Sequence, residues 1–136
     1  MDKREVIMDH YSNPRNRKRI NDSSYLVENT SNSSCIDNLD IYVKFQDDKI
    51  EDIAFEGEAC AISISSASIM TSNLKGKTVE DAITYITNME AMLNDKEYNS
   101  NVLKEAVVYE DTKNTSRKTC TWLPYAALKK ILENYK

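Results

Sequence analysis

Two stretches of alternating apolar and polar residues, separated by a pair of aspartates, constrain the fold of this chain most. Residues 39–45 (LDIYVKF) and 50–55 (IEDIAF) carry the β-branched and aromatic residues that strands favour. Asp47 and Asp48 lie between them, where a tight turn would reverse the chain. An antiparallel hairpin returns the chain to the end where it began. Residues just before the first strand and just after the second are therefore expected to lie close together.

Cysteines flank this expected hairpin. Cys35 precedes the first strand and Cys60 follows the second, so we expect both at one end of the sheet. Asp37 lies two residues after Cys35, and Cys120 begins the last apolar segment. Three soft thiolates and one carboxylate make four ligands, the number that a tetrahedral zinc or iron site uses. Spacing alone is a weak signal, because the chain lacks a Cys-x-x-Cys pair and cysteine is commonly a buried apolar residue.

Apolar spacing predicts helices in most of the remaining chain. These are expected over residues 2–11, 60–74, 78–89, 102–108 and 120–135, with one more strand at 25–27. Polar runs are expected as loops or linkers at 14–24, 29–34, 93–101 and 110–118. Strands followed by helices predict an α+β fold, in which helices pack on one face of a small antiparallel sheet of about three strands.

The position of two cysteines at predicted helix starts bears on their chemistry. The free N–H groups and the dipole at a helix N-terminus lower a thiol's pKa, so we expect Cys60 and Cys120 to ionise easily. A thiolate is both the better metal ligand and the better nucleophile. Such a site can hold zinc, hold iron with sulfide, or accept sulfur as a persulfide. Asp37, a harder ligand than a cysteine, would leave a more labile coordination position.

Length and charge exclude several classes of function. A chain of 136 residues predicts one domain over 1–136, with a net charge of −4 that argues against nucleic-acid binding. No apolar run approaches the roughly 20 residues that span a bilayer, so no membrane partner is expected. The charged N-terminus is unlike a secretory signal. We therefore expect a cytoplasmic protein, in whose reducing compartment cysteines serve more often as ligands or catalytic groups than in disulfides.

Four segments resemble, in order, those of a known family. Residues 10–16 (HYSNPRN) resemble the DHYxNPRN opening of the U-type iron–sulfur cluster assembly proteins, which include IscU, SufU and the N-terminal domain of NifU. Residues 35–37 (CID) resemble the family's Cys-Gly-Asp, and residues 55–63 (FEGEACAIS) resemble its FxGxGCAIS segment. Residues 117–125 (RKTCTWLPY) resemble the segment that holds its third cysteine. The likeness covers nearly the whole chain.

The resemblance implies a role for each candidate residue. Cys35, Asp37, Cys60 and Cys120 match the family's metal ligands, and the three cysteines would also hold a cluster if one is bound. Members of the SufU branch take a persulfide onto a cysteine, and Cys35 is the expected acceptor here because a ligand on a loop can leave the metal most easily. Arg117 matches the arginine three residues before the third cysteine, and it would assist the site or bind a partner.

The branch of the family decides which function is expected. Thr119 stands where the IscU branch commonly has histidine, and the long span from Cys60 to Cys120 resembles the SufU branch. This implies one zinc ion per chain and persulfide sulfur accepted from a SufS-type cysteine desulfurase, for use by downstream iron–sulfur apoproteins. An IscU-like scaffold that assembles a [2Fe–2S] cluster with iron stays open, as does a zinc-stabilised binding module without sulfur transfer. Whether the chain is an enzyme is therefore also open.

Some positions depart from the family pattern. Ile36 and Ala59 stand where the family has glycine, and Tyr125 stands where it has tryptophan. A β-branched residue is strained wherever φ is positive, so Ile36 implies either a different loop backbone or a less well-formed site. His10, the single histidine, is expected at a helix end or on a partner surface rather than on a metal. The basic run at residues 15–19 is expected as a solvated loop or a contact with an acidic desulfurase surface.

Overall fold

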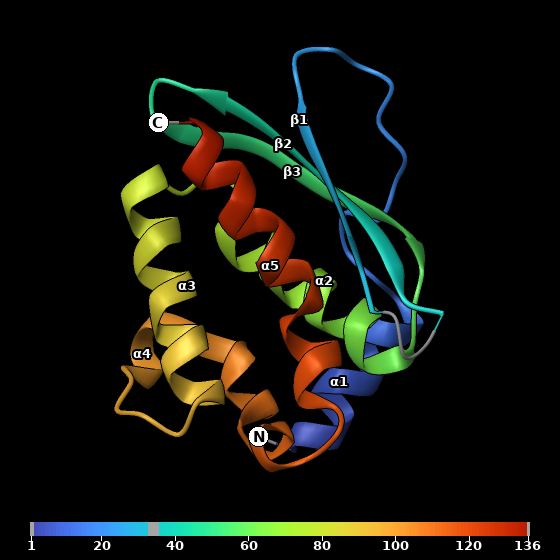
Figure 1. The fold of residues 1–136 in the computed structure, drawn as a ribbon, viewed down its shortest axis with the longest axis vertical. Helices are drawn as coiled ribbons and strands as arrows, with labels where there is room; N and C mark the ends of the chain where they lie inside the picture. Colours follow the sequence, from blue (N-terminus) through green and yellow to red (C-terminus); the bar gives the residue numbers. More distant parts are fainter. Residues whose placement is uncertain (1, 33–35, 136) are drawn as a thin grey trace.

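A three-stranded antiparallel sheet with helices packed against one face makes up the fold (Figure 1), in a computed structural model that describes residues 2–32 and 36–135. The strands are β1 (Leu26–Ser31), β2 (Asn38–Gln46) and β3 (Lys49–Glu58), in the order β1-β2-β3. The helices are α1 (Lys3–Ser12), α2 (Ala61–Leu74), α3 (Val79–Leu93), α4 (Ser100–Leu103), the 3₁₀ helix η1 (Lys104–Asn114) and α5 (Lys118–Tyr135). The expected α+β class is confirmed.

The predicted hairpin is formed by β2 and β3. Its turn consists of Asp47 and Asp48, whose φ angles are 52° and 61°, between the paired residues Gln46 and Lys49. Two residues in the left-handed region match the right-handed twist of the strands that they join. Pairing continues to Asn38 opposite Glu58, so the chain enters and leaves the hairpin at one end of the sheet.

Strand β1 is longer than its apolar residues predict. The polar residues 29–31, expected in a loop, pair with β2 from Asn29 opposite Asp40 to Ser31 opposite Asn38. Asn29 is held further by its side-chain amide, which donates to Asn38 Oδ1 at 2.7 Å and to Asp40 Oδ1 at 2.9 Å. Polar side chains suit this edge strand because much of it faces solvent. Of the expected loop 29–34, residue 32 lies outside the strand, and residues 33 and 34 lie outside the described residues.

The basic segment after α1 runs beside β3. Arg17 forms a parallel bridge with Phe55, whose N–H donates to Asn16 O and whose carbonyl accepts from the Lys18 N–H. Arg17 also donates to Glu56 Oε1 at 3.0 Å and to Gly57 O at 2.8 Å. The segment is therefore partly bound to the sheet rather than being only a solvated loop.

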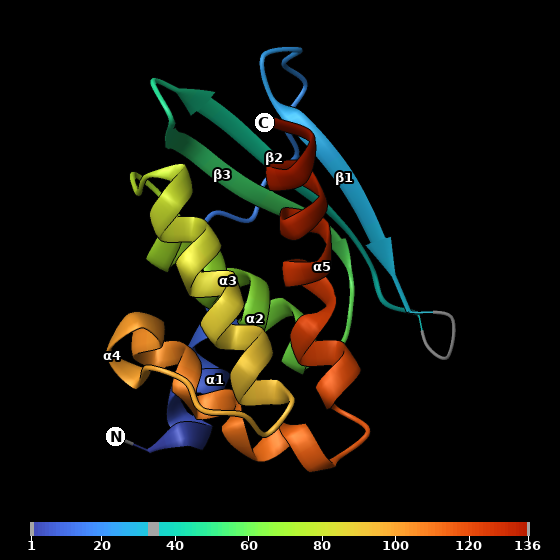
Figure 2. The same ribbon diagram turned by 60° about the vertical axis from the view of Figure 1, so that its left-hand side comes forward.

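The core lies between the sheet and the helices. In Figure 2, α5 crosses the face of the sheet, with α2 and α3 beside it. The apolar stripe predicted for α5 is confirmed, because its residues are all buried: Leu123, Ala127, Leu128, Ile131 and Leu132. From the sheet, alternate β2 residues are fully buried: Leu39, Ile41 and Val43. The part of the chain that the structure describes contains no helix that could span a lipid bilayer.

Helix α2 is enclosed by other elements, and hydroxyl groups attach it to them. Ser63 and Ser66 donate to carbonyls of α5, Ser65 accepts from Tyr109 of η1, and Ser68 bonds to His10 of α1. These serines are all fully buried. Small hydroxyl side chains let neighbouring helices approach closely, and each hydroxyl is hydrogen-bonded, as burial requires.

The segment before α5 is more ordered than its charge predicts. The composition of residues 110–118 predicts a structureless linker, but η1 continues to Asn114 and α5 begins at Lys118. Tyr109 is fully buried, and Thr112 donates to the Tyr109 carbonyl at 2.6 Å. Buried anchors spaced along η1 therefore outweigh its polar composition. This segment leads directly into the turn that carries Cys120.

Candidate metal centre

Three element ends meet at the open end of the β2–β3 hairpin, opposite its turn. Asp37 directly precedes β2, Cys60 directly precedes α2, and Cys120 lies in the first turn of α5. One ligand atom from each residue, a carboxylate oxygen and two Sγ atoms, lies within 4.8 Å of the others. The prediction that the hairpin brings its flanking residues together is confirmed for Asp37 and Cys60. Cys35, the fourth candidate, lies outside the described residues.

The Asp37 carboxylate occupies the N-terminus of α2. Asp37 is 1% exposed, and its Oδ1 accepts the Cys60 N–H at 2.7 Å. Cys60 is the N-cap residue of α2 and makes no side-chain capping bond of its own. The carboxylate of Asp37 therefore supplies an acceptor that the cap residue does not, and the helix dipole favours a negative charge there.

Cys120 does not behave as its position in the sequence predicts. It is the third residue of α5 and 6% exposed, and burial raises the pKa of its thiol to about 12, reinforced by Cys60 and by the negative charge of Asp37. The expectation that this thiol ionises easily is therefore wrong for the metal-free protein, because desolvation outweighs the helix N-terminus. A cation held among these groups would favour the thiolate instead.

Ser63 belongs to the site, although sequence reasoning did not single it out. Its fully buried Oγ donates to Asp37 Oδ2 at 3.1 Å and lies 3.0 Å from the Cys120 carbonyl oxygen. The Sγ atom of Cys60 lies 3.6 Å from Ser63 Oγ. One hydroxyl thus contacts all three candidate ligand residues that the structure describes. Its position three residues after Cys60, on the same face of the first turn, was the available signal.

The donors present fit a single zinc or iron ion. Ligand atoms about 2.3 Å from a tetrahedral ion lie about 3.8 Å from one another, which a cluster within 4.8 Å approaches. Two thiols and a buried carboxylate are a soft donor set with one hard member. The hydrogen bonds from Cys60 N–H and Ser63 orient the carboxylate, as the outer partners of metal ligands commonly do.

Among the nearby glycine positions, Gly57 is the one that the fold requires. Its φ is 140°, and a Cβ atom there would lie 2.2 Å from the Asn38 carbonyl oxygen. Ala59, at a family glycine position, is not among the described non-glycine residues with positive φ. A side chain is therefore accommodated at Ala59 without backbone strain. Ile36, at the other family glycine position, is 77% exposed.

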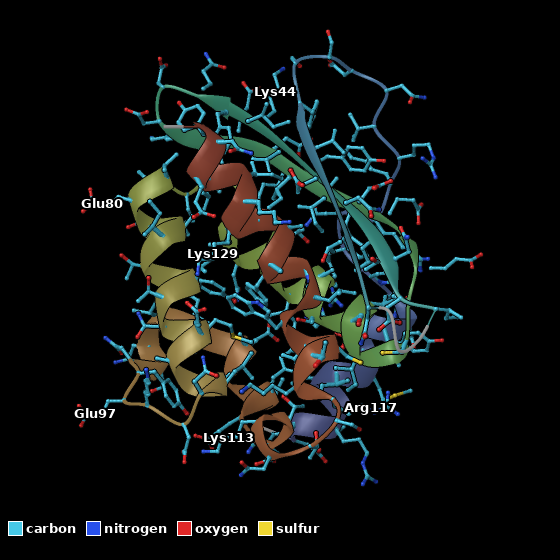
Figure 3. All side chains as sticks on the ribbon, viewed as in Figure 1. Lys44, Glu80, Glu97, Lys113, Arg117 and Lys129 are labelled. Atoms are coloured by element: carbon cyan, nitrogen blue, oxygen red, sulfur yellow. The ribbon has the colours of Figure 1, made fainter. Side chains whose placement is uncertain are left out.

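The remaining candidates differ in how far they are exposed. Figure 3 shows Arg117 beside the start of α5, at the opposite end of the molecule from Lys44 of β2. Arg117 is exposed. His10 lies in the last turn of α1, as a helix-end role predicts, but it is 3% exposed, so the alternative of a partner surface is wrong. Tyr125 is fully buried and stacks on Tyr85 and Trp122.

Fold and site together define an α+β protein that gathers a carboxylate and two thiols at one end of its sheet. The chain belongs to the family described as the NifU-like N terminal domain, whose model matches residues 2–136. The family resemblance read from the sequence motifs is thereby confirmed.

Two curated relatives cover most of the chain. It is 40% identical over 129 residues to the zinc-dependent sulfurtransferase SufU of Bacillus subtilis, covering 93% of this chain and 86% of the relative. It is 32% identical over 130 residues to the iron–sulfur cluster assembly scaffold protein IscU of Thermotoga maritima, covering 95% and 91%.

Solved structures share the fold. A SUF-system iron–sulfur cluster assembly scaffold protein from Fervidobacterium islandicum superposes with a TM-score of 0.89 at 36% identity, covering 94% of each chain. The N-terminal part of a NifU-like protein from Brucella abortus superposes with a TM-score of 0.84 at 20% identity, covering 97% of this chain and 94% of its own. The latter likeness concerns the fold alone.

Proposed function

We propose that this chain is a zinc-dependent sulfur acceptor of iron–sulfur cluster assembly, which takes persulfide sulfur from a SufS-type cysteine desulfurase. The cluster of Asp37, Cys60 and Cys120 is the observation that carries the proposal. The 40% identity to a zinc-dependent sulfurtransferase supports zinc as the metal and sulfur transfer as the activity. Downstream iron–sulfur apoproteins would receive the sulfur after its incorporation into clusters, and the cytoplasm is the compartment we propose.

Four residues would hold the zinc ion in this proposal: Cys35, Asp37, Cys60 and Cys120. When bound, zinc would stabilise the thiolate form of its cysteine ligands near neutral pH. The protein contributes the orientation of Asp37, through the Cys60 N–H and the Ser63 hydroxyl, and the burial of Cys120. Asp37 is the weakest donor for a soft ion, so the site retains one labile ligand.

The sulfur transfer conserves atoms and electrons. The thiolate of Cys35 attacks the terminal sulfur of the desulfurase cysteine persulfide, and a new S–S bond forms on Cys35. The S–S bond of the donor breaks, and the donor cysteine leaves as a thiolate. Cys35 becomes the persulfide and the desulfurase cysteine becomes the thiolate. The reaction is therefore an exchange that requires no external oxidant or reductant. Arg117, exposed at the start of α5, would assist by pairing with acidic groups of the donor or with the arriving sulfur.

Metal content and persulfide formation test this proposal directly. Protein purified without added iron is expected to contain about one zinc per chain. After incubation with desulfurase and cysteine, wild type should gain one sulfur atom by mass spectrometry, and Cys35→Ala should not. Ser34→Ala is the neighbouring control and should gain sulfur normally. Sulfur on Cys35→Ala would show that another cysteine is the acceptor, and none on wild type would favour a zinc-stabilised binding module.

A second candidate is a scaffold that assembles a [2Fe–2S] cluster. The 32% identity to an IscU scaffold protein over nearly the whole chain favours it, and Cys35, Cys60 and Cys120 would hold the cluster. Anaerobic reconstitution with iron and sulfide separates the two functions. A stable cluster absorbance supports the scaffold, whereas retained zinc without a cluster supports the sulfur acceptor.

A further inference from the structure

Ser63 faces two acceptors with one hydroxyl proton. Its Oγ lies 3.1 Å from Asp37 Oδ2 and 3.0 Å from the Cys120 carbonyl oxygen, and both distances permit a hydrogen bond. A serine hydroxyl carries a single hydrogen, so it donates to one of them at a time. Asp37, Ser63 and Cys120 are all buried. The acceptor that receives no hydrogen bond from Ser63 is a buried polar group with one partner fewer, which costs free energy.

Pro124 removes the helical hydrogen bond that the Cys120 carbonyl would normally accept. In a regular helix the carbonyl of residue 120 accepts the N–H of residue 124. Pro124 lies inside α5 and has no N–H, so the Cys120 carbonyl lacks its normal helical donor. Ser63 reaches this carbonyl from α2. A buried carbonyl without a donor costs free energy, so this contact has a specific structural use.

The charge of Asp37 decides which acceptor is preferred. A carboxylate is a stronger acceptor than a neutral carbonyl, so in the metal-free protein the Ser63 proton belongs mainly to Asp37. A carboxylate that binds a metal through one oxygen can still accept a hydrogen bond at the other, so Ser63 can orient Asp37 with and without the metal. The Cys120 carbonyl, which lacks its regular helical donor, lies within reach of the same hydroxyl.

We infer that Ser63 is a positioning residue of the metal centre, whose one hydroxyl holds in place both the Asp37 carboxylate and the backbone that carries Cys120. This inference rests on the proposed metal site but not on the sulfur transfer. The hydroxyl holds Asp37 ready to bind, and it also supports the backbone of α5 at the residue that supplies the Cys120 ligand. Zinc affinity therefore depends on Ser63 through both elements.

Ser66 offers a matched control three residues further along α2. It is also fully buried, and its Oγ donates to the Thr121 carbonyl of α5 at 2.7 Å. This hydrogen bond involves none of the candidate ligand residues. Ser66→Ala thus removes the same kind of α2–α5 hydrogen bond as Ser63→Ala without disturbing Asp37.

Competition with a zinc chelator of known affinity provides the test. We expect Ser63→Ala to weaken zinc binding by about 10- to 100-fold, the range found for outer partners of metal ligands. Ser66→Ala should change it by less than about threefold. Metal-free melting temperatures, measured for both variants, separate loss of stability from loss of affinity. Equal zinc affinities of the two variants would overturn the inference.

Pro124→Ala tests the role of the carbonyl. The new N–H at residue 124 gives Cys120 its own helical donor, so Ser63→Ala in this background should cost less zinc affinity than in wild type. Equal losses in the two backgrounds would contradict a contribution of Ser63 through the Cys120 carbonyl. This background also supplies a usable protein if Ser63→Ala alone folds poorly.

If wild type itself binds no zinc, the proposed function fails as well. If zinc binds as expected but no persulfide forms, only the sulfur transfer fails.

Discussion

His10 shows how a single buried side chain joins separate elements. Its Nδ1 lies 2.7 Å from Ser68 Oγ of α2, and its Nε2 lies 3.6 Å from Glu105 Oε1 of η1. Ser68 Oγ also accepts the Arg15 N–H at 2.8 Å. Burial lowers the pKa of His10, assisted by the charge of Arg15, although Glu105 and Asp9 oppose the shift. The histidine therefore stays neutral to lower pH than an exposed one would.

This lowered pKa predicts a loss of stability in acid. Below about pH 6.5 the unfolded chain protonates His10 while the folded chain does not, so the unfolded state binds more protons. The free energy of unfolding should therefore fall as the pH drops below about 6.5, until the lowered folded-state pKa is reached. The single histidine can be titrated without ambiguity by NMR. His10→Asn, which cannot titrate, should lose this part of the pH dependence, and an unshifted histidine pKa would contradict the prediction.

Gly57 shows how the backbone beside the site depends on one missing side chain. Its φ of 140° and the close approach to Asn38 make any Cβ atom unfavourable. Gly57→Ala should lower the free energy of unfolding by about 1–3 kcal/mol through backbone strain, and the clash with Asn38 should add to this loss.

Gly76 is the matched control for this prediction. Its φ is 84°, but a Cβ atom placed there would have no other atom within 4 Å. Gly76→Ala therefore meets only the φ penalty, whereas Gly57→Ala also meets the Asn38 carbonyl oxygen. Urea unfolding should show the larger loss for Gly57→Ala. Equal losses would mean that β2 and β3 separate easily at this position.

At the scale of elements, the β2–β3 hairpin is the unit that local sequence specifies best. Its turn has both central residues at positive φ, where asparagine and glycine are favoured over other residues. Asp48 adds a contact in which it accepts a hydrogen bond from Tyr135 Oη at 3.2 Å. The turn therefore combines a backbone requirement with one side-chain contact.

Substitution of Asp48 separates these two contributions. Asp48→Gly and Asp48→Ala both lose the contact with Tyr135, but only alanine retains a cost for positive φ. Asp48→Gly should therefore be more stable than Asp48→Ala by about 1 kcal/mol, measured by thermal or urea unfolding. A more stable alanine variant would show that the turn changes its conformation on substitution.

Elements that lack regularly spaced apolar residues are predicted less well from the sequence. Residues 29–31 are polar yet belong to β1, because pairing with β2 supplies the hydrogen bonds of an edge strand. Residues 110–114 are charged yet continue η1, because Tyr109 is anchored in the core. In both cases contacts with distant residues outweigh local propensity. Such contacts cannot be detected from neighbouring residues in the sequence.

At the scale of the whole molecule, the candidate metal centre joins β2, α2 and α5 at their ends. The main apolar core lies between the sheet and the helices and uses other residues. Metal binding is therefore expected to stabilise a protein that already folds without it.

Zinc should raise the melting temperature in a concentration-dependent way. At free zinc one hundredfold above the Kd, mass action adds about 2.7 kcal/mol to the free energy of unfolding. Calorimetry with and without a chelator measures this change, and circular dichroism of the chelated protein should retain its helical signal. Complete unfolding by the chelator would mean that the centre is required for the fold itself.

Much of this protein was determined by its sequence alone. Alternating residues around Asp47 and Asp48 specified the hairpin, helical spacing specified the buried stripe of α5, and the motifs around the cysteines identified the family. These features depend on neighbouring residues or on segments that can be recognised individually, so they can be read along the chain.

Only the tertiary structure decided the properties that arise between segments. It placed Ser63 among Asp37, Cys60 and Cys120, and burial raised the Cys120 pKa although a helix start predicts the opposite. It also brought the Ser63 hydroxyl of α2 to the Cys120 carbonyl, which Pro124 leaves without its regular helical donor. Desolvation and hydrogen bonding across elements depend on which distant groups share one small volume, and no local pattern encodes that proximity.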